Sequence, residues 1–584
     1  MSQGWLQFGV FIVALTALVP LLGTYLAKVF ASERVFLSPV AGPVERLGYR
    51  LLRVRPGEGQ DWREYARSVL AFSLLSWLLL YLILRTQSIQ PFNPEGFGSG
   101  PWNLSFNTAS SFVTNTNWQY YGGETTLSHF AQMTGLAVQN FVSAAVGTAV
   151  LAAAIRGFAA RSASSLGNFW SDLTRITLYV LLPIAFVAAL VLVSQGVVQT
   201  LSGSELVHTL SGAEQTLSFG PVASQEAIKL LGTNGGGFFN VNSAFPFENP
   251  NSATNIFELF LMLAIPASLP YAFGRIVGNR RQGWAIYAAM MAMFVASVAV
   301  VYVAEQHGSP AQHAAGLVTH AFDGSSGGNM EGKEVRNGIV QSSLWTAVTT
   351  VTSAGAVNAA FDSLTGIGGL VPLANLSTGE VIFGGVGSGL YGMLMLVLLT
   401  VFIAGLMVGR TPEFLGKKIE AREVKLVLVA VLATPLLVLI GTAWAVAGDD
   451  GTQSIYNPGP QGFSESLYAY MSQANNNGSA FAGYTGFLQP NAPGNAGAEA
   501  FDFPNLLGGV VMLLGRFMPM IAVLAVAGSL AGKQVAPLGA GTFRADSPTF
   551  VVLLLGVVMI VAALTFFPAF LLGPVVQGLT GQLF

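Results

Sequence analysis

Long apolar stretches recur along this chain, and polar connections separate them. A helix needs roughly 20 apolar residues to cross about 30 Å of hydrocarbon, and ten stretches meet that length. The predicted spans cover residues 6–29, 66–86, 130–155, 172–196, 253–276, 284–304, 390–410, 424–447, 505–530 and 548–572. The pattern therefore predicts an all-α membrane protein with ten transmembrane helices.

Basic residues fall almost entirely on alternate connections between these spans. Of the 26 Lys and Arg residues, 21 lie on the connections after the first, third, fifth, seventh and ninth spans, if the residues at the adjoining ends of the spans are included. The even-numbered connections hold only Lys229, Lys333 and Arg336, while Arg85 and Arg516 lie in spans two and nine. Because Lys and Arg favour the cytoplasmic side of a membrane, we expect both termini outside the cytoplasm.

The four even-numbered connections resemble one another. Each carries about ten residues able to form a helix, followed by small polar residues, and a serine near the start that could cap the helix. They read SFNTASSFVTNTNWQ, SQEAIKLLGTNGGGFFN, QSSLWTAVTTVTSAGAVN and SESLYAYMSQANNNGSAF, with the serines Ser105, Ser224, Ser342 and Ser464. We expect four membrane–pore–membrane repeats around a pseudo-fourfold pore, with one extra span at each end.

The ends of these four segments suggest cation coordination. One aligned column contains Asn117, Gly235, Gly355 and Gly478. Gly and Asn tolerate positive φ, so such segments can turn successive carbonyls toward one axis and replace the hydration shell of an ion. No ring of Asp or Glu accompanies them, which favours a monovalent cation. A single loop of this composition is more often an ordinary turn. Four such loops, each at the same position between two predicted spans, favour an ion-selectivity filter.

Composition narrows the function further. Only 9% of the residues are charged and 52% are hydrophobic, and the formal net charge is −2, so nucleic acid is not an expected partner. The chain has no cysteine and five histidines, which excludes disulfides and thiolate metal sites. Neither a GxxxxGK[ST] loop nor a DKTGT phosphorylation motif occurs. We therefore expect no ATP hydrolysis by this chain alone, and no nucleotide bound to it.

Several longer motifs resemble those of one transporter family. TNTNWQ, LGTNGGGFFNVNSAFPFENP, NMEGKE, TSAGAVN, GRTPEFLGKK and NNNGSAFAG occur in this order along the chain. They look like the signatures of the KdpA family, the potassium-transporting subunits of bacterial Kdp ATPases, whose fold is akin to the Trk and Ktr transporters. The resemblance implies K+ as the transported ion, the bacterial cytoplasmic (inner) membrane with periplasmic termini, and partners KdpB, a P-type ATPase, KdpC and the small KdpF.

The resemblance also implies which residues form the K+ filter. Filter positions fall on Thr114, Asn115, Thr116, Asn117, Thr233, Asn234, Gly235, Ser353, Ala354, Gly355, Asn476, Asn477 and Gly478. Gln119 is expected close behind the first of these segments. By the same resemblance Arg516, within span nine, lies below the filter and opposes leak. The alternative for Arg516 is an ion pair with a carboxylate that serves packing alone.

The run FGGVGSGLYG at 383–392 should bend or break a helix, since each Gly weakens it. Its Gly384, Gly385, Gly387 and Gly389 form either a gate and side exit below the filter or a close helix contact through small residues. Glu380, just before the run, could attract a cation along that exit or be an ordinary solvated acid. Two functional classes also remain open: the pore subunit of an ATP-driven pump, or a gradient-driven Trk/Ktr-like transporter or channel.

Arg410, Lys417, Lys418 and Arg422 form a basic cluster after span seven. Such clusters are usually topology signals and lipid anchors, and docking to the ATPase subunit is the sharper alternative. The predicted division of the chain is 1–60 for the first span and linker, 61–160, 161–280, 281–415 and 416–531 for the four repeats, and 532–584 for the terminal span.

Overall fold

The computed structural model describes residues 2–321, 327–487, 503–536 and 544–580. Within these residues ten helical segments are long and apolar enough to cross a membrane, which confirms the predicted number. The helices that form them are α1 (Ser2–Phe30), α3 (Trp62–Arg85), α6 (Val138–Ala159), α7 (Phe169–Ile176), α8 (Leu182–Ser194), α10 (Ser252–Ile276), α11 (Arg280–His307), α15 (Ser388–Met407), α16 (Ala421–Ala447), α19 (Phe503–Ala531) and α20 (Pro548–Phe570). Short π-helical turns, η2 (Ala131–Ala137), η3 (Thr177–Leu181) and η6 (Leu571–Val575), continue three of the spans.

Four further helices, here called the half helices, lie between the spans on the even-numbered connections. They are α4 (Trp102–Val113), α9 (Val222–Leu231), α13 (Gly338–Val351) and α18 (Gly459–Ala474). The predicted serine caps are wrong, because all four serines lie inside the helices and none accepts a capping hydrogen bond. Three of the half helices instead begin directly after a proline, whose fixed φ suits the start of a helix: Pro101, Pro221 and Pro458.

One helix was not anticipated from the sequence. The helix α14 (Gly366–Ser377) precedes the glycine run, and residues 378–387 between it and α15 are irregular. The segment GIGGLVPLANLS contains three glycines and a proline, all poor helix formers, and is too short to cross a membrane, so hydropathy alone did not separate it from the loop. The interruption before α15 agrees with the predicted break.

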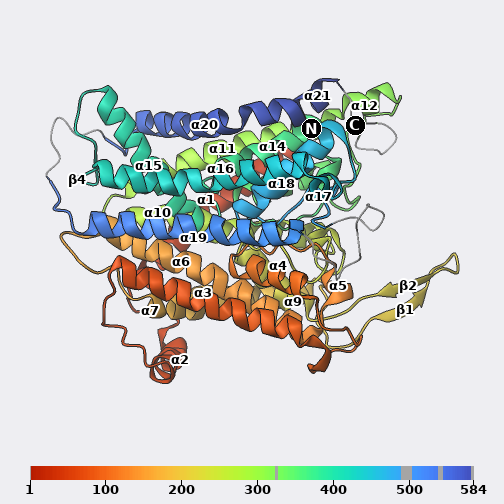
Figure 1. Cartoon of the computed structure of the whole chain (residues 1–584), viewed down its shortest axis with the longest axis horizontal. Helices are drawn as coiled ribbons and strands as arrows, with labels where there is room; N and C mark the ends of the chain where they lie inside the picture. Colours follow the sequence, from red (N-terminus) through yellow and green to blue (C-terminus); the bar gives the residue numbers. More distant parts are fainter. Residues whose placement is uncertain (1, 322–326, 488–502, 537–543, 581–584) are drawn as a thin grey trace.

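The remaining helices and strands are short and lie at the ends of the bundle. They are α2 (Ser38–Leu51), α5 (Gly123–Thr126), α12 (Pro310–Ala314), α17 (Asp449–Thr452), α21 (Val576–Thr580), η1 (Gln87–Ile89), η4 (Asn242–Ala244), η5 (Phe361–Ser363) and the hairpins β1 (Glu205–His208)–β2 (Glu214–Leu217) and β3 (Glu413–Phe414)–β4 (Lys417–Lys418). Both hairpins are antiparallel, with Glu205 opposite Leu217 in the first and Glu413 opposite Lys418 in the second. Figure 1 shows β1–β2 projecting from the end of the bundle that carries α4 and α5.

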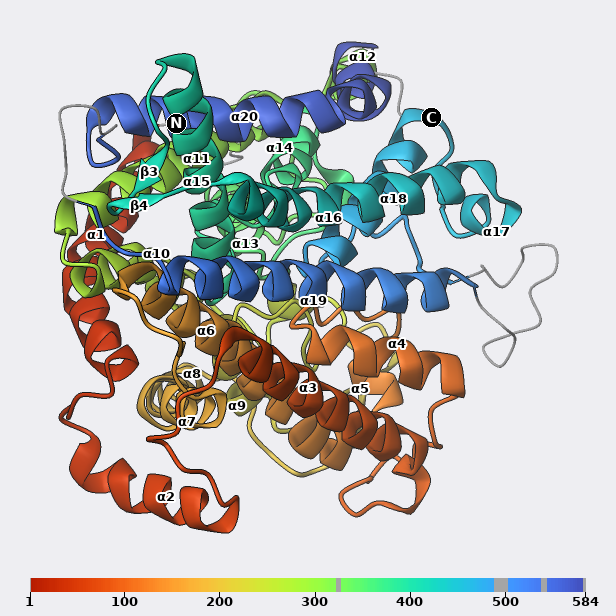
Figure 2. The ribbon, with the colours of Figure 1, turned by 60° about the vertical axis from the view of Figure 1, so that its left-hand side comes forward.

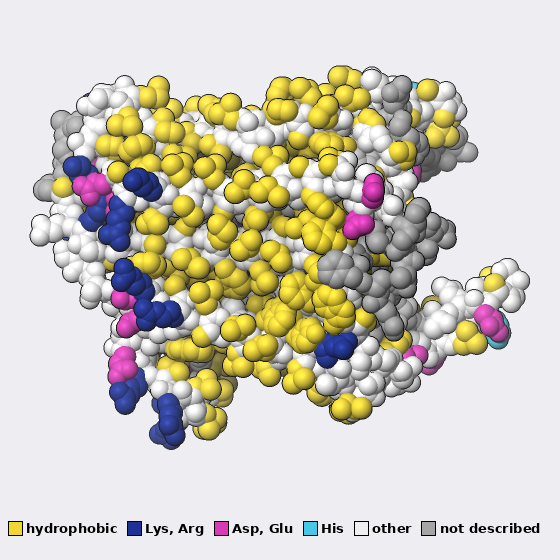
Figure 3. Space-filling model, viewed as in Figure 1, with side chains coloured by type: hydrophobic (Ala, Val, Ile, Leu, Met, Phe, Trp, Pro, Cys, Tyr) yellow, Lys and Arg dark blue, Asp and Glu magenta, His cyan; other side chains and the backbone are white. Residues whose placement is uncertain are grey.

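The surface separates into an apolar middle and a basic end. Hydrophobic side chains cover the middle of the face in Figure 3, and most Lys and Arg side chains on this face gather at the left-hand end. The N and C labels lie at the opposite, right-hand end in Figure 1. A broad apolar band between polar ends is the surface expected of a chain surrounded by lipid.

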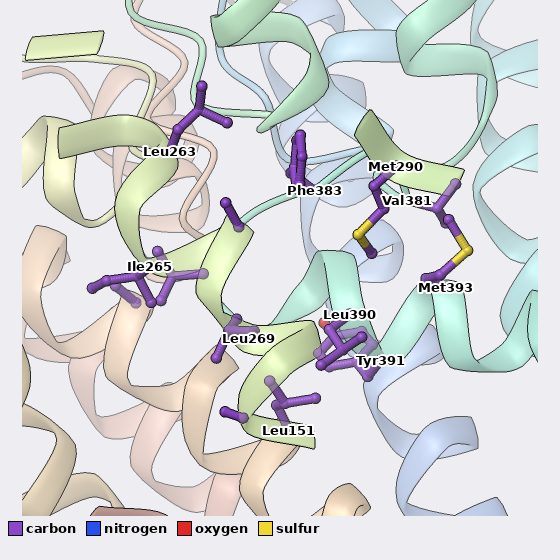
Figure 4. Packing of buried hydrophobic residues seen from close by; sticks show 14 of the residues in the cluster. Leu151, Leu263, Ile265, Leu269, Met290, Val381, Phe383, Leu390, Tyr391 and Met393 are labelled. Atoms are coloured by element: carbon purple, nitrogen blue, oxygen red, sulfur yellow. The ribbon is translucent and has the colours of Figure 1, made fainter. Parts of the chain in front are cut away.

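Among the described residues the buried apolar side chains form four clusters, and the most extensive of them surrounds the irregular loop. Figure 4 shows Phe383, from that loop, among buried side chains such as Leu263 and Met290. The ring of Phe383 lies 5.9 Å from Tyr287 and 6.1 Å from Phe294, measured between centroids. The loop is therefore anchored in the core by an aromatic side chain although its backbone is glycine-rich.

Candidate functional site

The backbone turns in the same way after each half helix. The second residue beyond each helix has positive φ: Asn115 at 73°, Thr233 at 52°, Ser353 at 50° and Asn476 at 50°. A positive φ is uncommon outside Gly and Asn, and for the β-branched Thr233 it is a true outlier. Such strain persists only where the surroundings enforce it, and it concentrates at ligand sites.

The glycine column behaves less uniformly than the sequence suggested. Asn117, Gly355 and Gly478 have positive φ, at 57°, 86° and 101°. Gly235 does not, so for this residue the predicted reason is wrong. A Cβ at Gly235 would collide with the carbonyl oxygens of Thr116 and Asn477, so this position needs glycine because other backbones approach it closely.

The four segments meet at one place in the structure. A Cβ on Gly355 would lie 2.8 Å from Cα of Gly235 and would strike the carbonyl of Asn477. A Cβ on Gly478 would lie 2.9 Å from the same Cα and would strike the carbonyl of Thr116. Backbone from all four connections, far apart in sequence, is therefore packed within a few ångströms.

Side-chain amides and hydroxyls join neighbouring segments. The first and second are linked by the Asn115 amide, which donates to the carbonyls of Gly232 (3.2 Å) and Thr233 (2.9 Å). The third and fourth are linked by Ser353 Oγ, which donates to the Asn475 carbonyl at 2.9 Å. The fourth returns to the first through Asn476 Nδ2, 2.9 Å from Thr116 Oγ1. These bonds hold the segments at a fixed separation.

In each segment one residue lies between the positive-φ residue that follows the half helix and the aligned column of Asn117, Gly235, Gly355 and Gly478. They are Thr116, Asn234, Ala354 and Asn477, and no described residue donates a hydrogen bond to their carbonyl oxygens. Buried carbonyls are normally paired, so four oxygens without such donors on converging segments are a candidate ligand set for a cation. All four residues are fully buried, and Ala354 has the same kind of backbone carbonyl as the other three although its side chain is apolar.

A wide vestibule opens above these segments. It is a cavity of about 680 Å³ whose lining includes Gln119, Gly235, Gly355 and Gly478. Gln119 Oε1 accepts a hydrogen bond of 3.0 Å from the Gly237 amide. The side chain of Gln119 therefore braces the second segment, close behind the first, where the sequence placed it.

A smaller cavity of about 60 Å³ is lined by residues from the filter, the irregular loop and span nine. Asn476, Glu380 and Arg516 all line it. The Arg516 side chain is 4% exposed, and no carboxylate among the described residues lies within 4.0 Å of it. Arg516 therefore forms no direct ion pair among the described residues, and Glu380, which lines the same cavity, is the acid that shares its surroundings. Glu380 is half-buried beside this cavity rather than fully solvated.

The irregular loop lies directly against the filter. The Val386 amide donates to Thr233 Oγ1 at 3.0 Å, and the Gly384 amide donates to the last carbonyl of α13, that of Val351, at 2.8 Å. Gly384 and Gly387 have positive φ, and a Cβ on Gly387 would strike the backbone of Gly147. The glycines therefore let the loop pass between the filter and span three.

Sequence reasoning missed a buried ion cluster behind the second segment. Lys229, on α9, is fully buried and pairs with Glu226 and, at 2.7 Å, with Glu248. The Lys229 carbonyl also accepts the amide of the filter residue Asn234, at 2.9 Å. Two clues were available: Lys229 is one of three basic residues on the outer connections, and Glu248 belongs to the FENP motif.

Comparisons with known proteins identify the family of this chain. The sequence model of the KdpA family, described as the potassium-transporting ATPase A subunit, matches residues 9–579. The chain belongs to the KdpA family. It is 54% identical over 585 residues to the potassium-transporting ATPase potassium-binding subunit of Rhizobium rhizogenes and 53% identical to that of Mesorhizobium japonicum, covering 100% of both chains in each case.

The fold also has a distant relative among solved structures. The potassium transporter TrkH from Vibrio parahaemolyticus superposes with a TM-score of 0.51 at 15% identity, covering 86% of this chain and 97% of TrkH. At that identity the likeness concerns the fold alone. It supports the sequence-based expectation of a Trk-like arrangement of helices for this KdpA family member.

Two KdpA family motifs have structural roles that the sequence did not reveal. Lys333 of NMEGKE is buried in an ion pair of 2.6 Å with Glu305. Lys417 of GRTPEFLGKK is 1% exposed, and its Nζ donates to the Gly157 carbonyl at 2.8 Å. Lys417 is therefore not on the surface, whereas Arg410, Lys418 and Arg422 of the basic cluster are exposed.

The buried position of Lys417 predicts a pH dependence of stability. Burial, together with the nearby Lys533 charge, lowers the pKa of Lys417 to about 8 from its usual 10.5. Between pH 8 and 10.5 the unfolded chain binds more protons than the folded one, so the free energy of unfolding rises with pH in this window. We expect thermal denaturation at pH 7 and pH 9 to show this gain in the parent chain and a smaller gain in Lys417→Met. An equal gain in both would contradict the assignment.

Proposed function

We propose that this chain is the K+-selective pore subunit of an ATP-driven K+ uptake complex. The observation that carries the proposal is the convergence of four buried backbone segments with carbonyls that lack donors among the described residues. Such oxygens can replace the water around a monovalent cation. Membership of the KdpA family, whose relatives are named potassium-binding subunits, supports K+ as the ion.

The proposed ion ligands come from all four segments. They are Thr114, Asn115, Thr116 and Asn117, then Thr233, Asn234 and Gly235, then Ser353, Ala354 and Gly355, then Asn476, Asn477 and Gly478. The half helices direct their C-terminal ends, each with about half a negative charge, toward the same place. This charge attracts a cation without the tight binding that a ring of carboxylates would give.

The proposed location is the bacterial cytoplasmic (inner) membrane, with the basic end of the bundle in the cytoplasm. The positive-inside rule supports this orientation, because most Lys and Arg side chains visible in Figure 3 lie at one end. The vestibule then faces the periplasm, as do the helix ends near Ser2 and Thr580; Met1 and Phe584 themselves lie outside the described residues. ATP hydrolysis is assigned to a separate P-type subunit, KdpB, with KdpC and KdpF as further partners.

A gradient-driven transporter is the alternative, and the TrkH-like fold is the observation that favours it. Purification of the chain together with a P-type ATPase encoded beside it distinguishes the two. We expect the complex to hydrolyse ATP faster when K+ is added, and Na+ at the same concentration to have little effect. Equal stimulation by Na+ would contradict K+ selection, and failure to co-purify would favour the alternative.

Substitution of Arg516 tests whether its charge limits passive cation leak below the proposed filter. Its guanidinium borders the small cavity, where a fixed positive charge disfavours a second cation. We expect Arg516→Gln to raise passive Rb+ flux through reconstituted vesicles about tenfold or more, while Arg516→Lys keeps flux low. Unchanged flux and unchanged apparent K+ affinity in Arg516→Gln would contradict this role.

Glu380 and the glycine loop complete the proposed path. Gly384, Gly385, Gly387 and Gly389 let the loop lie under the filter, and the loop's bond to Thr233 couples its position to the ion site. We assign the loop to gating and Glu380 to attracting the ion toward a side exit. Arg410, Lys418 and Arg422 remain as the exposed residues for docking of the ATPase subunit.

A further inference from the structure

The helix α2 stands apart from the bundle. Figure 1 shows it nearly end-on below the left-hand part of the molecule, whereas the spans run across the picture, and Figure 2 shows it lengthwise beside α7. It therefore lies across the direction of the spans, near the basic end. Neither the ion path nor the filter uses this helix.

One face of α2 and the residue before it is apolar and exposed. Its side chains recur every three or four residues, the spacing of a single helix face, and are between 53% and 78% exposed. This apolar stripe consists of Phe36, Val40, Val44, Leu47 and Leu51. A stripe of this kind on a helix that lies across the spans is typical of a segment embedded at a membrane surface.

The opposite face of α2 is fixed to the bundle by polar contacts. Glu45 Oε1 lies 3.1 Å from Arg175 Nη1, and Tyr179 Oη donates to Glu45 Oε2 at 2.5 Å. Tyr49 Oη lies 3.0 Å from Ser171 Oγ. Because these contacts occupy the inner face, the apolar stripe is directed away from the bundle, and only the ring of Phe36, 5.4 Å from that of Tyr25 between centroids, is in ring contact with a span among the described residues.

Three arginines flank the stripe. Arg46, Arg50 and Arg53 are exposed, and no carboxylate among the described residues lies within 4.0 Å of them, in contrast to Arg55, which pairs with Glu58. In Figure 3 the projection formed by α2 carries hydrophobic side chains on its right-hand side, toward the middle of the apolar band, and basic side chains on its left-hand and lower sides. The charges thus lie where phospholipid headgroups would be.

We propose that α2 is an anionic-phospholipid site: its apolar stripe enters the cytoplasmic leaflet, and Arg46, Arg50 and Arg53 bind the headgroup phosphates. Guanidinium groups bind phosphate oxygens in pairs of hydrogen bonds. The stripe is apolar and exposed, like the lipid-facing surface of the spans. The positive charges beside it favour phospholipids with negatively charged headgroups. This site is independent of the proposed transport function.

The chain contains no cysteine, so single cysteines can report on lipid contact. A bimane fluorophore on Leu47→Cys, in the full chain in nanodiscs, would be quenched by brominated phosphatidylglycerol or phosphatidylcholine. Leu74→Cys on α3 and Leu210→Cys beyond β1 serve as controls; both side chains are exposed, one on a predicted span and one on the projecting hairpin. We expect equal quenching by both lipids at Leu74 and none at Leu210.

At Leu47 we expect stronger quenching by phosphatidylglycerol at equal mole fraction. Arg46→Gln and Arg50→Gln should each lower this preference about fivefold, as expected for one basic side chain near an anionic surface. Arg161→Gln, which removes an exposed charge outside α2, should leave it unchanged. Thermal denaturation checks that the variants remain folded, as expected for exposed positions.

Three outcomes would overturn the proposal. Equal quenching by the two lipids at Leu47 would remove the headgroup preference. Quenching of Leu47 by aqueous iodide but by neither lipid would place the stripe in water. Lipid quenching that disappears when the ATPase complex is assembled would make α2 a docking surface for a protein partner instead.

Discussion

Replacing Gly355 by alanine is expected to abolish high-affinity K+ binding while the chain still folds. The new Cβ would strike the Asn477 carbonyl and lie 2.7 Å from its carbon. The carbonyl must turn away, and the φ of 86° adds backbone strain for any residue but glycine. Because ion selection depends on carbonyl positions, we expect apparent K+ affinity, measured by K+-stimulated ATPase activity of the complex, to fall by about 100-fold or more.

Gly338 supplies a matched control for this substitution. It has a φ of 60° and begins α13, yet a Cβ there would meet no atom within 4 Å. Gly338→Ala therefore carries the backbone strain without the collision, and we expect a small loss of stability with K+ affinity unchanged. If both variants changed K+ affinity equally, strain in the fold rather than carbonyl displacement would be responsible.

Lys229→Met is expected to destabilise the chain far more than the loss of any exposed charge. Removal of one partner from a buried ion pair typically costs about 3–5 kcal/mol, because it leaves a charge without compensation. In this protein the loss of one ammonium group leaves Glu226 and Glu248 together in a fully buried place. The free energy of unfolding, from denaturant titration of the purified chain, should fall by about that amount.

A second substitution separates charge from packing at this cluster. The double substitution Lys229→Met/Glu248→Gln also removes one of the two carboxylates that Lys229→Met leaves without a partner charge. It should therefore recover part of the lost free energy of unfolding. Lys418→Met is the surface control, since the Lys418 side chain is 61% exposed and 3.8 Å from Glu420; such pairs contribute about 0–1 kcal/mol. A stability change in Lys229→Met no larger than that in Lys418→Met would contradict the importance of the buried cluster.

The spans and the existence of the half helices could be predicted because lipid imposes a simple rule on sequence. A crossing helix must be long and apolar, so each of the ten spans was visible in hydropathy, and α14 was missed because it is too short for that rule. The helix starts were misplaced because a serine before an apolar run resembles a cap, whereas Pro101, Pro221 and Pro458 begin three of the half helices.

The filter could be predicted only in part, for a different reason. Repetition of composition identified the four segments, but backbone conformation at single residues depends on what surrounds them. Thr233 has positive φ although its β-branched side chain opposes it, and Gly235 lacks it although glycine, which has no side chain, would permit it. Likewise no local pattern pairs Lys229 with Glu248, or buries Lys417 against Gly157, because these contacts arise only when distant segments pack. The K+ role of the filter residues and the boundaries of the repeats remain predictions.

The proposed ring of ion ligands comes from four unequal segments of a single polypeptide. In a homotetrameric pore every substitution appears four times, so a small change at one codon is multiplied around the axis. In this chain a mutation alters one of the four segments around the axis, here called a quadrant, and leaves the other three unchanged. The sequence of each quadrant can therefore change separately. Ala354 can stand where another segment has Thr116 or Asn477, and one quadrant can be adjusted for a neighbouring subunit without redesign of the others.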